Sequence, residues 1–561
     1  MKVFVNGKIW QWASGDLDRY ENAFAEWMAV ADDGEIIEVG SGPLPTAFTS
    51  EEVEVHELDG QLVLPGLHDS HIHAYGLGES AEYVDLLGCD SFEDFARRLS
   101  EYDTAFPDKA FIVGFGWAQD QLSPSARYPS RHDIDAVIKD RPVILYRGCW
   151  HIAVVNTKAL EVAGIDVNET HFDIPDGAVD IDENGVTGVL RESATELVSK
   201  HANEPSMDLR VKCLKNALQQ CVRFGLTAVH TNDERGWPVH QTLQEGSGLP
   251  LRVYMTPSID ELASNPDIPP SGSREGLLSC DRIKIFSDGS LGAETAALRY
   301  PYKGTTNQGI LMNSDEDLVE QISAATTRGY RVEIHAIGDR AAEQVLMALR
   351  KAQVTPDKRP ILTHCQILGD DLIEQMREQG VIGNIQPSFT ITDASFVRKR
   401  LEDHLFPVSY CWKTMLQRGV VCAGGSDAPI ETCNPFQGMF DAIYRHKPDQ
   451  PDDVFLPDEK LSFNEALAVY TRNGAYAAME EHRLGQLAPG YRADFVVLRE
   501  DVTQNHGALV QPDLVESVWI DGSAKYQYSE SDAKQLSTPD LTKSLLPGKN
   551  GRIRVCRCCR R

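Results

Sequence analysis

The sequence lacks any uninterrupted apolar segment long enough to cross a bilayer, and its first residues, MKVFVNGKIWQWASGD, contain no apolar core of the kind that a secretory signal has. It is also short of positive charge, with 54 Lys and Arg against 84 Asp and Glu, so that its formal net charge is −30. A surface this acidic repels nucleic-acid phosphates and anionic lipid headgroups. We therefore expect neither a nucleic-acid nor a membrane partner.

Cysteines are few for the length and are scattered, with 12 among 561 residues. A disulfide-stabilised secreted domain concentrates its cysteines in a short chain, whereas several here lie in apolar stretches such as VCAGG and ILTHC. These features favour a reduced, cytoplasmic protein. Hydrophobic residues make up 42% and charged residues 25%, as in ordinary globular proteins, and the length predicts more than one structural unit.

Both ends of the chain contain short strand-like stretches separated by turn signals. NG, DDG and LDG separate the first of them, and LGQLAPGYRADFVVLRED and DLVESVWIDG repeat the pattern near the other end. We predict that residues 1–63 and 482–528 pair into one small β-sandwich domain. Residues 529–561 are polar and end in GRIRVCRCCRR, which indicates a disordered tail.

Eight apolar runs in the centre each end in a polar residue, and helical patterns separate the later ones. They are LPGLHDSHIH (64–73), LTAVHTND (226–233), LRVYMTP (251–257), RIKIFSDG (282–289), RVEIHAIGD (331–339), PILTHCQ (360–366), VIGNIQPS (381–388) and VVCAGGSDAP (420–429). Strands that alternate with helices predict an α/β fold, and eight of them predict a closed (β/α)8 TIM-type barrel over residues 64–481. Residues 79–220 interrupt the alternation, so we predict a large insertion after strand one, folded over the barrel mouth.

The first run contains two histidines, His71 and His73, that are two residues apart. Along a strand, residues i and i+2 point to the same side, so both imidazoles can reach one metal ion. Alone, the pair is equally compatible with a polar loop that leaves a buried strand. Later runs end in His335, His364 and Asp427. Because the carboxyl ends of barrel strands meet on one face, these five side chains are expected to converge.

Lys284 lies in RIKIF between Ile283 and Ile285, which predicts that the isoleucines face the helices and that the lysine faces the barrel interior. A buried lysine tends to lose its proton, and a neutral amine can react with carbon dioxide to give a carbamate that bridges two metal ions. The alternative is a charged lysine that is paired with a nearby carboxylate such as Asp288.

Together these motifs resemble the amidohydrolase superfamily. LVLPGLHDSHIH is similar to its N-terminal motif, and KIFSDGSLGAETAAL, EIHAIGDRA, THCQ and GGSDAPIETCNPFQGM resemble its amidohydrolase 3 branch, which includes the YtcJ-like proteins and N-substituted formamide deformylase. PGYRADFVVL resembles the segment in which the chain returns to the small β domain. The resemblance extends over residues 1–525 and leaves out the tail.

The resemblance implies a metal centre whose ligands are His71, His73, Lys284, His335, His364 and Asp427, with Lys284 as the carbamylated bridge. It implies one or two divalent cations per chain, with zinc as the first choice, although the same ligands suit manganese, iron, cobalt or nickel. A metal-activated hydroxide would attack the substrate, and Asp427 would take its proton and deliver it to the leaving amine. The implied reaction is hydrolysis of a non-peptide carbon–nitrogen bond in an amide, formamide or cyclic amide.

Further candidates accompany this set. The resemblance places pocket residues in the insertion, where Trp117 and His151 are candidates for substrate contact, and Asp288 follows the fourth strand near the barrel mouth. Glu192 is a candidate for a buried carboxylate that replaces the lysine as the bridge. His68 points to the opposite strand face from the histidine pair and is interpreted as structural.

Two other functions fit the same framework. One is a non-catalytic scaffold or regulatory protein, although such relatives lose metal ligands and here all six positions hold suitable residues. The other is a metal-dependent isomerase, decarboxylase or esterase. For a hydrolase, the expected partners are a small-molecule substrate and, as an option, a second copy of the chain in a homodimer.

Overall fold

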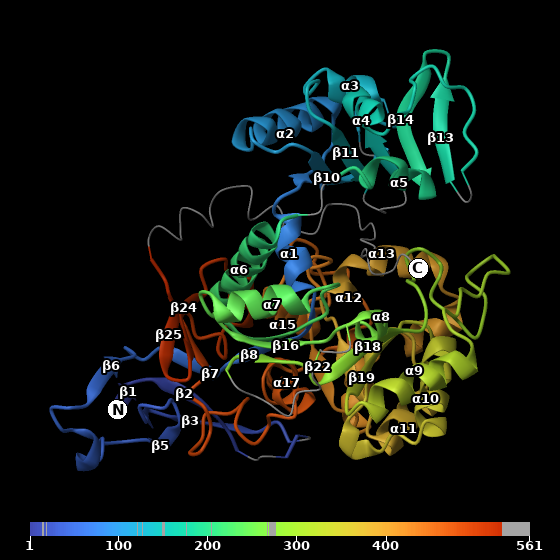
Figure 1. The fold of residues 1–561 in the computed structure, drawn as a ribbon. Helices are drawn as coiled ribbons and strands as arrows, with labels where there is room; N and C mark the ends of the chain where they lie inside the picture. The colour runs from blue at the N-terminus through green and yellow to red at the C-terminus, as the bar shows by residue number, and fades with distance from the viewer. Residues whose placement is uncertain are drawn as a thin grey trace. The chain divides into compact units, whose positions relative to one another are not determined.

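A computed structural model describes residues 1–529 of the chain apart from 14–15, 18, 120–121, 126, 148–151, 175–176, 203–204, 266–267 and 269–275. Contacts divide the chain into two compact units (Figure 1). Of the described residues, the first unit contains 1–76 and 214–529, and the second contains 77–213. His151 and all but the first residue of the predicted tail lie outside the described residues.

Within the described part of the first unit, eight parallel strands each lie in one of the eight apolar runs of the central sequence. One sheet has the order β17-β16-β15-β8, where β17 is a short addition, and the other has the order β18-β19-β20-β21-β22. The strands are β8 (Leu67–Ile72), β15 (Leu226–Thr231), β16 (Arg252–Met255), β17 (Leu278–Ser279), β18 (Arg282–Phe286), β19 (Arg331–Ala336), β20 (Ile361–His364), β21 (Ile382–Ile385) and β22 (Cys422–Gly424).

Backbone hydrogen bonds connect the two parallel sheets on both sides. The N–H of Lys284 in β18 donates to the carbonyl of Pro257, just after β16, at 2.8 Å. On the other side the N–H of Asp427 donates to the carbonyl of His71 at 2.7 Å, so the segment after β22 lies against the end of β8. Parallel strands in this order, alternating with helices, form a TIM-barrel-like α/β fold.

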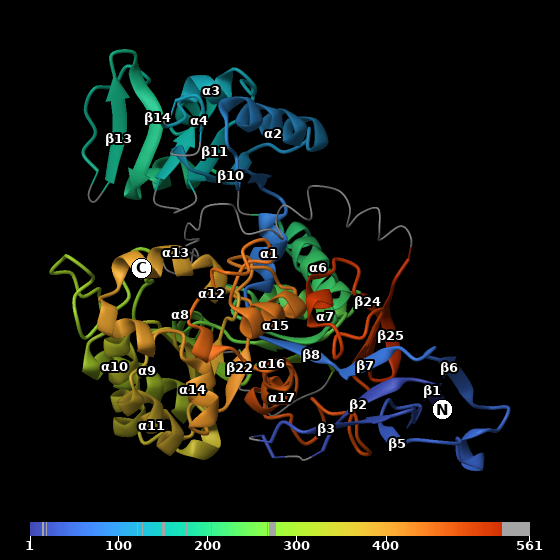
Figure 2. The ribbon, with the colours of Figure 1, turned by 180° about the vertical axis from the view of Figure 1, so that it is seen from behind.

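Helices follow the parallel strands, and α9 and α10 pack against β19. The helices α9, α10 and α11 lie side by side (Figure 2). Ser314 caps α9 by accepting a hydrogen bond from the N–H of Asp317, and Gly380 ends α11 in the left-handed conformation. No helix in the described part of the chain has the length and apolarity needed to cross a membrane. The helices of this unit and its boundary are α1 (Ala74–Ser80), α6 (Met207–Arg223), α7 (Trp237–Glu245), α8 (Ile259–Ser264), α9 (Asp315–Thr327), α10 (Asp339–Lys351), α11 (Asp370–Gln379), α12 (Phe389–Thr392), α13 (Ala394–Arg400), α14 (Trp412–Gln417), α15 (Pro435–Tyr444), α16 (Phe463–Tyr470) and α17 (Arg472–Ala477).

Two antiparallel-rich sheets of the first unit combine both ends of the described chain. Their orders are β5-β4-β1-β6 and β25-β24-β23-β7-β2-β3. β7 pairs antiparallel with β23, so that Val63 lies opposite Val497. Phe4 and Val30 of the first sheet and Val63, Val497 and Trp519 of the second belong to one hydrophobic cluster. The strands are β1 (Lys2–Val5), β2 (Lys8–Trp12), β3 (Asn22–Ala25), β4 (Trp27–Val30), β5 (Ile36–Gly40), β6 (Glu54–Glu57), β7 (Leu62–Pro65), β23 (Phe495–Leu498), β24 (Val515–Ile520) and β25 (Ser523–Gln527).

A buried ion pair connects the parallel strands to these sheets. Arg252 of β16 contacts Asp494 at 2.7 Å, and both side chains are buried. Removing the guanidinium leaves the Asp494 carboxylate buried without its cation, so we expect Arg252→Ala to lower the free energy of unfolding by about 3–5 kcal/mol. Chemical denaturation measures the loss. Lys8→Ala, which removes a more exposed ion pair with Asp501, is the matched control and should cost less than about 1 kcal/mol. Equal losses would contradict the prediction.

The second unit contains, in its described residues, a sheet of the order β13-β14-β12-β11-β10-β9. Alternate residues of β11 enter two different clusters, with Val143 and Leu145 in one and Ile144 and Tyr146 in the other. Because α2 contributes to the first cluster and α4 to the second, the sheet is covered on both faces. The elements are β9 (Val84–Asp85), α2 (Phe92–Ala105), β10 (Ile112–Trp117), α3 (Arg131–Asp135), β11 (Val143–Arg147), β12 (Ile152–Val155), α4 (Thr157–Val162), β13 (Gly177–Asp182), β14 (Gly185–Glu192) and α5 (Glu196–Ser199).

Candidate metal centre

Four imidazoles and one carboxylate lie together where the parallel strands end. His71 lies near the end of β8 and His73 follows it, His335 lies near the end of β19, and His364 is the last residue of β20. Asp427 follows β22. Each of the five residues is at most 7% exposed. The convergence of strand ends on one face explains how residues so far apart in the sequence come together.

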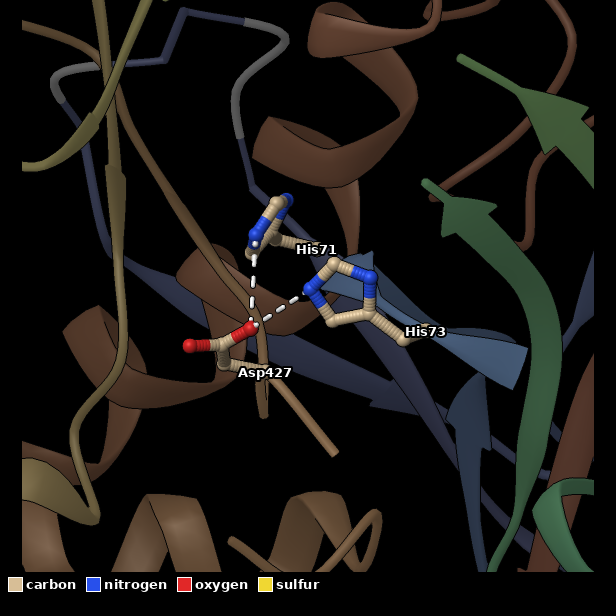
Figure 3. Close-up of side chains that lie close together, drawn as sticks. All are labelled: His71, His73 and Asp427. Carbon is tan, nitrogen blue, oxygen red and sulfur yellow. Dashed lines mark ion pairs between the residues drawn. The ribbon is translucent and has the colours of Figure 1, made fainter. Parts of the chain in front are cut away.

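His71, His73 and Asp427 form the tightest part of this group (Figure 3). Oδ1 of Asp427 lies 3.1 Å from Nε2 of His73 and 3.5 Å from Nε2 of His71. The ligand atoms of the three residues all lie within 4.8 Å of one another. Imidazole nitrogens and a carboxylate oxygen are ligands that zinc and related divalent ions accept. The three residues therefore fit a metal ion.

His335 and His364 lie beside this triad. Their ring centroids are 4.5 Å apart, and the ring of His364 is 5.5 Å from that of His71. The pKa of His364 is well below its ordinary value, mainly because the ring is buried and secondly because His335 lies beside it. A neutral imidazole is the form that binds a metal. The two later histidines are therefore placed next to the triad as a second pair of nitrogen donors.

The other ring nitrogens of the first pair are held by groups outside the triad. Nδ1 of His71 lies 2.8 Å from Oε1 of Glu333, and Nδ1 of His73 contacts the carbonyl of Asn232. A histidine that donates its Nδ1–H to such a partner presents its Nε2 lone pair on the opposite side of the ring. Both Nε2 atoms consequently face Asp427.

His335 is held through the opposite ring nitrogen. Its Nε2 lies 3.1 Å from the carbonyl of Gly289 and 3.4 Å from Oδ1 of Asp288, which leaves Nδ1 on the other side of the ring. Asp288 is fully buried. Its oxygens also accept backbone hydrogen bonds from Ala297, Ile337 and Gly338. Asp288 thus ties the loop after β18 to the loop after β19 and orients His335.

Glu333 is a site residue that the sequence interpretation missed. It is buried, and its Oε1 lies 3.4 Å from Nζ of the buried Lys284 as well as close to His71. The charged lysine of the alternative interpretation is thus paired with Glu333 rather than with Asp288. A signal was present, because Glu333 precedes His335 by two residues in RVEIH and so points to the same side of the strand.

The carboxylates of the site are strongly influenced by their neighbours. Burial alone would raise the pKa of Glu333, but the charge of Lys284 and the hydrogen bond from His71 hold it well below its ordinary value. Burial opposes ionisation of Asp427 as well, but the two imidazoles beside it, His71 and His73, hold its pKa well below its usual range. Both residues are therefore carboxylates at neutral pH.

Asp69 connects the two segments that carry the triad. It accepts hydrogen bonds from the N–H of His71 at 3.1 Å and from the N–H and hydroxyl of Ser426 at 3.0 and 2.5 Å. Burial raises the pKa of Asp69 to about 7 in spite of these hydrogen bonds. Asp427 itself has a φ of 56°, which is uncommon for a residue other than glycine. The Asp69 contacts hold the neighbouring backbone in place around this conformation.

The remaining candidates lie elsewhere. Trp117 is fully buried in the second unit, and its indole N–H donates to the carbonyl of Leu145 at 2.8 Å. Glu192 is exposed at the end of β14, so the prediction of a buried carboxylate there is wrong. His68 is buried with its ring 5.9 Å from that of His230, and burial lowers its pKa to about 3.

A TIM-barrel-like fold with histidines and an aspartate at its strand ends is the arrangement of a metal-binding protein of the amidohydrolase class. The chain belongs to the amidohydrolase family, because the model of this family, described as Amidohydro_3, matches residues 54–526. YtcJ of Bacillus subtilis (strain 168) is 32% identical over 527 residues, which cover 91% of this chain and 97% of that protein.

Other relatives agree with this assignment. N-substituted formamide deformylase of Arthrobacter pascens is 24% identical over 526 residues, which cover 89% of this chain and 94% of that protein. The crystal structure of an uncharacterized metal-dependent hydrolase from Pyrococcus furiosus is 29% identical with a TM-score of 0.73, over 89% of this chain and 99% of that structure. The predicted family and its α/β, TIM-barrel-like fold are therefore confirmed.

Proposed function

We propose that this chain is a metal-dependent hydrolase that cleaves a carbon–nitrogen bond, other than a peptide bond, in an amide, formamide or cyclic amide. The observation that carries the proposal is the buried group of His71, His73 and Asp427, whose ligand atoms lie within 4.8 Å of one another at the ends of parallel strands. His335, His364 and Lys284 complete the proposed ligand set. A divalent cation bound there, zinc in the first place, supplies Lewis-acid polarisation of the carbonyl and activates water.

Asp427 is proposed to move the proton. Its Oδ1 faces both Nε2 atoms, while the other carboxylate oxygen points away from the two imidazoles (Figure 3). Oδ1 is therefore available to bind a metal ion together with the two histidines. The other oxygen can take the proton of the attacking water and return it to the leaving amine. The histidines hold their positions through Glu333 and Asn232 on the far sides of their rings.

Lys284 is proposed to be carbamylated when the site holds two metal ions. The ammonium group, which lies 3.4 Å from the carboxylate of Glu333, first loses one proton to give the neutral amine. Formation of the carbamate then joins the lysine nitrogen to carbon dioxide and releases a second proton from that nitrogen, and both protons pass to solvent. The positive charge of the Lys284 ammonium would thus be replaced by the negative charge of a carbamate, whose two oxygens can bind two cations.

We expect Lys284→Ala to lower the metal content from two ions per chain to one and to reduce activity, because the bridging carbamate cannot form. Elemental analysis of protein reconstituted with and without bicarbonate measures this, since the wild type should gain metal from bicarbonate and Lys284→Ala should not. Lys358→Ala removes an exposed lysine and serves as the control. A Lys284→Ala protein with full metal content and activity would exclude the carbamate.

The direct test of the function is a panel of substrates. The name of the Arthrobacter pascens relative puts N-substituted formamides first, followed by N-acyl amines, cyclic amides, dipeptides and esters. We expect metal-dependent turnover of a formamide or amide and lower turnover of dipeptides and esters. Inactivity against every amide and formamide, with the metal bound, would overturn the proposal.

Several finer features stay predictions of the same proposal. These are closure of the eight strands into one barrel, a β-sandwich of residues 1–63 and 482–528, and the insertion as part of the substrate pocket. Substrate contacts by Trp117, His151 and Asp288 and a homodimer belong with them. Light scattering of the purified protein tests the homodimer, and KM values of conservative variants test the substrate contacts.

A further inference from the structure

A chain of buried polar groups runs from β8 to His364. Nδ2 of Asn384 donates to the carbonyl of Ser70 at 2.6 Å, and Nε2 of Gln386 donates to Oδ1 of Asn384 at 2.8 Å. Oε1 of Gln386 then lies 2.9 Å from Nδ1 of His364. Ser70, Asn384 and Gln386 are 0% exposed and His364 is 4% exposed. We call these four residues the amide relay.

The direction of every hydrogen bond in the amide relay follows from its first member. A backbone carbonyl can only accept, so Asn384 must present its NH2 group to Ser70 and its oxygen to Gln386. Gln386 must then present its own NH2 group to Asn384, which leaves its oxygen for His364. An oxygen opposite Nδ1 requires a proton on that nitrogen. In a neutral imidazole, the lone pair is then on Nε2.

The sequence places these residues by strand geometry. Asn384 and Gln386 are two residues apart along β21 and its end, so their side chains point to the same side. β21 pairs with β20 on one side, with Asn384 opposite Thr363, the neighbour of His364. In the buried segment IGNIQ, residues 382–386, the two polar residues Asn384 and Gln386 thus lie on the same side among apolar neighbours.

We propose that Asn384 and Gln386 are positioning residues that hold His364 as the Nδ1-protonated tautomer and turn its Nε2 lone pair toward the candidate metal centre. This deepens the proposed function and rests on it only for the role of His364 as a ligand. The tautomer is a property of the protein without metal. The amide relay also differs from the support of His71, which a carboxylate, Glu333, holds in place.

The first experiment measures zinc affinity by competition with a chromophoric chelator. Gln386→Leu removes the acceptor opposite Nδ1 of His364, and we expect zinc affinity to fall by about 10–100-fold. Gln386→Glu keeps an acceptor at that position and should stay near the wild-type affinity or exceed it, because a carboxylate makes the imidazole a stronger donor. Equal affinity of wild type and Gln386→Leu, with thermal unfolding showing both folded, would overturn the proposal.

The second experiment reads the tautomer without metal. ¹⁵N NMR of histidine-labelled, metal-free full-length protein, with the signals assigned through His364→Gln, should show His364 protonated on Nδ1. Gln386→Glu still accepts from Nδ1 of His364 and should preserve this signal, so the proposal stays testable even if Gln386→Leu fails to fold. A proton on Nε2 in the wild type would overturn the proposal.

These two measurements distinguish failure of the amide relay from failure of the proposed metal-dependent function. If the wild type carries the Nδ1 proton on His364 but binds no zinc, the amide relay is upheld and the proposed metal-dependent function fails. If the wild type binds zinc but His364 is protonated on Nε2, the amide relay fails while the metal centre stands.

Discussion

A His71→Ala/His73→Ala double variant will bind markedly less metal than the wild type and will lose about 10³-fold or more in kcat/KM. Both Nε2 atoms face Oδ1 of Asp427, so the double substitution removes the two nitrogen donors of the tightest group in the site. A metal ion contributes several kcal/mol of transition-state stabilisation, and each 1.36 kcal/mol corresponds to a tenfold change in rate. Elemental analysis and a turnover assay on the same preparation measure the two losses together.

The control for this variant is His404→Ala, which removes an exposed imidazole that contacts Tyr300 rather than the site. It should keep the metal content and the activity of the wild type. The prediction fails if the wild type contains no transition metal, or if the double variant binds as much as the wild type. Circular dichroism of the double variant separates loss of the ligands from loss of the fold.

The general course of the chain could be predicted because it depends on patterns that are local in the sequence. Each of the eight apolar runs contains a parallel strand, and polar residues follow where each strand leaves the interior. Pairing of β7 with β23 is long-range, but turn signals and alternation at both chain ends were enough to suggest it. The organisation of residues 77–213 into their own sheet was harder to predict, because the alternating elements β9, α2, β10, α3 and β11 are followed by the antiparallel strands β12, β13 and β14 in the same sheet.

The candidate ligands could be predicted for the same reason, because HIH and the strand-end residues His335, His364 and Asp427 follow from periodicity and from the common face of parallel strands. The groups that hold these ligands in place could not be predicted. The contact of His73 with the carbonyl of Asn232 joins β8 to β15, and no pattern in either segment reveals it. Such contacts depend on side-chain direction and register between strands that are distant in the sequence.

Asp288 and Glu333 illustrate this limit. Proximity in the sequence favoured Asp288 as the partner of Lys284, but three backbone N–H groups hold its carboxylate in the loops after β18 and β19. Glu333 lies on the neighbouring strand β19, directly opposite Lys284 in the strand register. A partner in the next strand at the same register is the first place to look for the counter-charge of a buried lysine.

The Asp427→Asn variant tests the proposed proton transfer, and we expect kcat to fall by about 10²–10⁴-fold. Asparagine keeps the shape and one oxygen of the side chain, but it cannot take a proton from water and return it to an amine. Burial and the left-handed backbone of Asp427 are retained, since the two side chains have nearly the same size. Asp403→Asn, the same change at an exposed carboxylate, is the control and should leave kcat unchanged.

The basicity of the leaving amine distinguishes proton transfer from simple ligation by Asp427. An alkylamine must be protonated as it departs, whereas a weakly basic aromatic amine departs with less assistance. If Asp427 delivers the proton, Asp427→Asn will lose much more activity on alkyl amides or formamides than on the matching anilides. If Asp427 only binds the metal, the loss will be equal for both substrates and will follow the metal content. Metal analysis of the variant, with kcat for both substrate series at saturating zinc, decides between these outcomes.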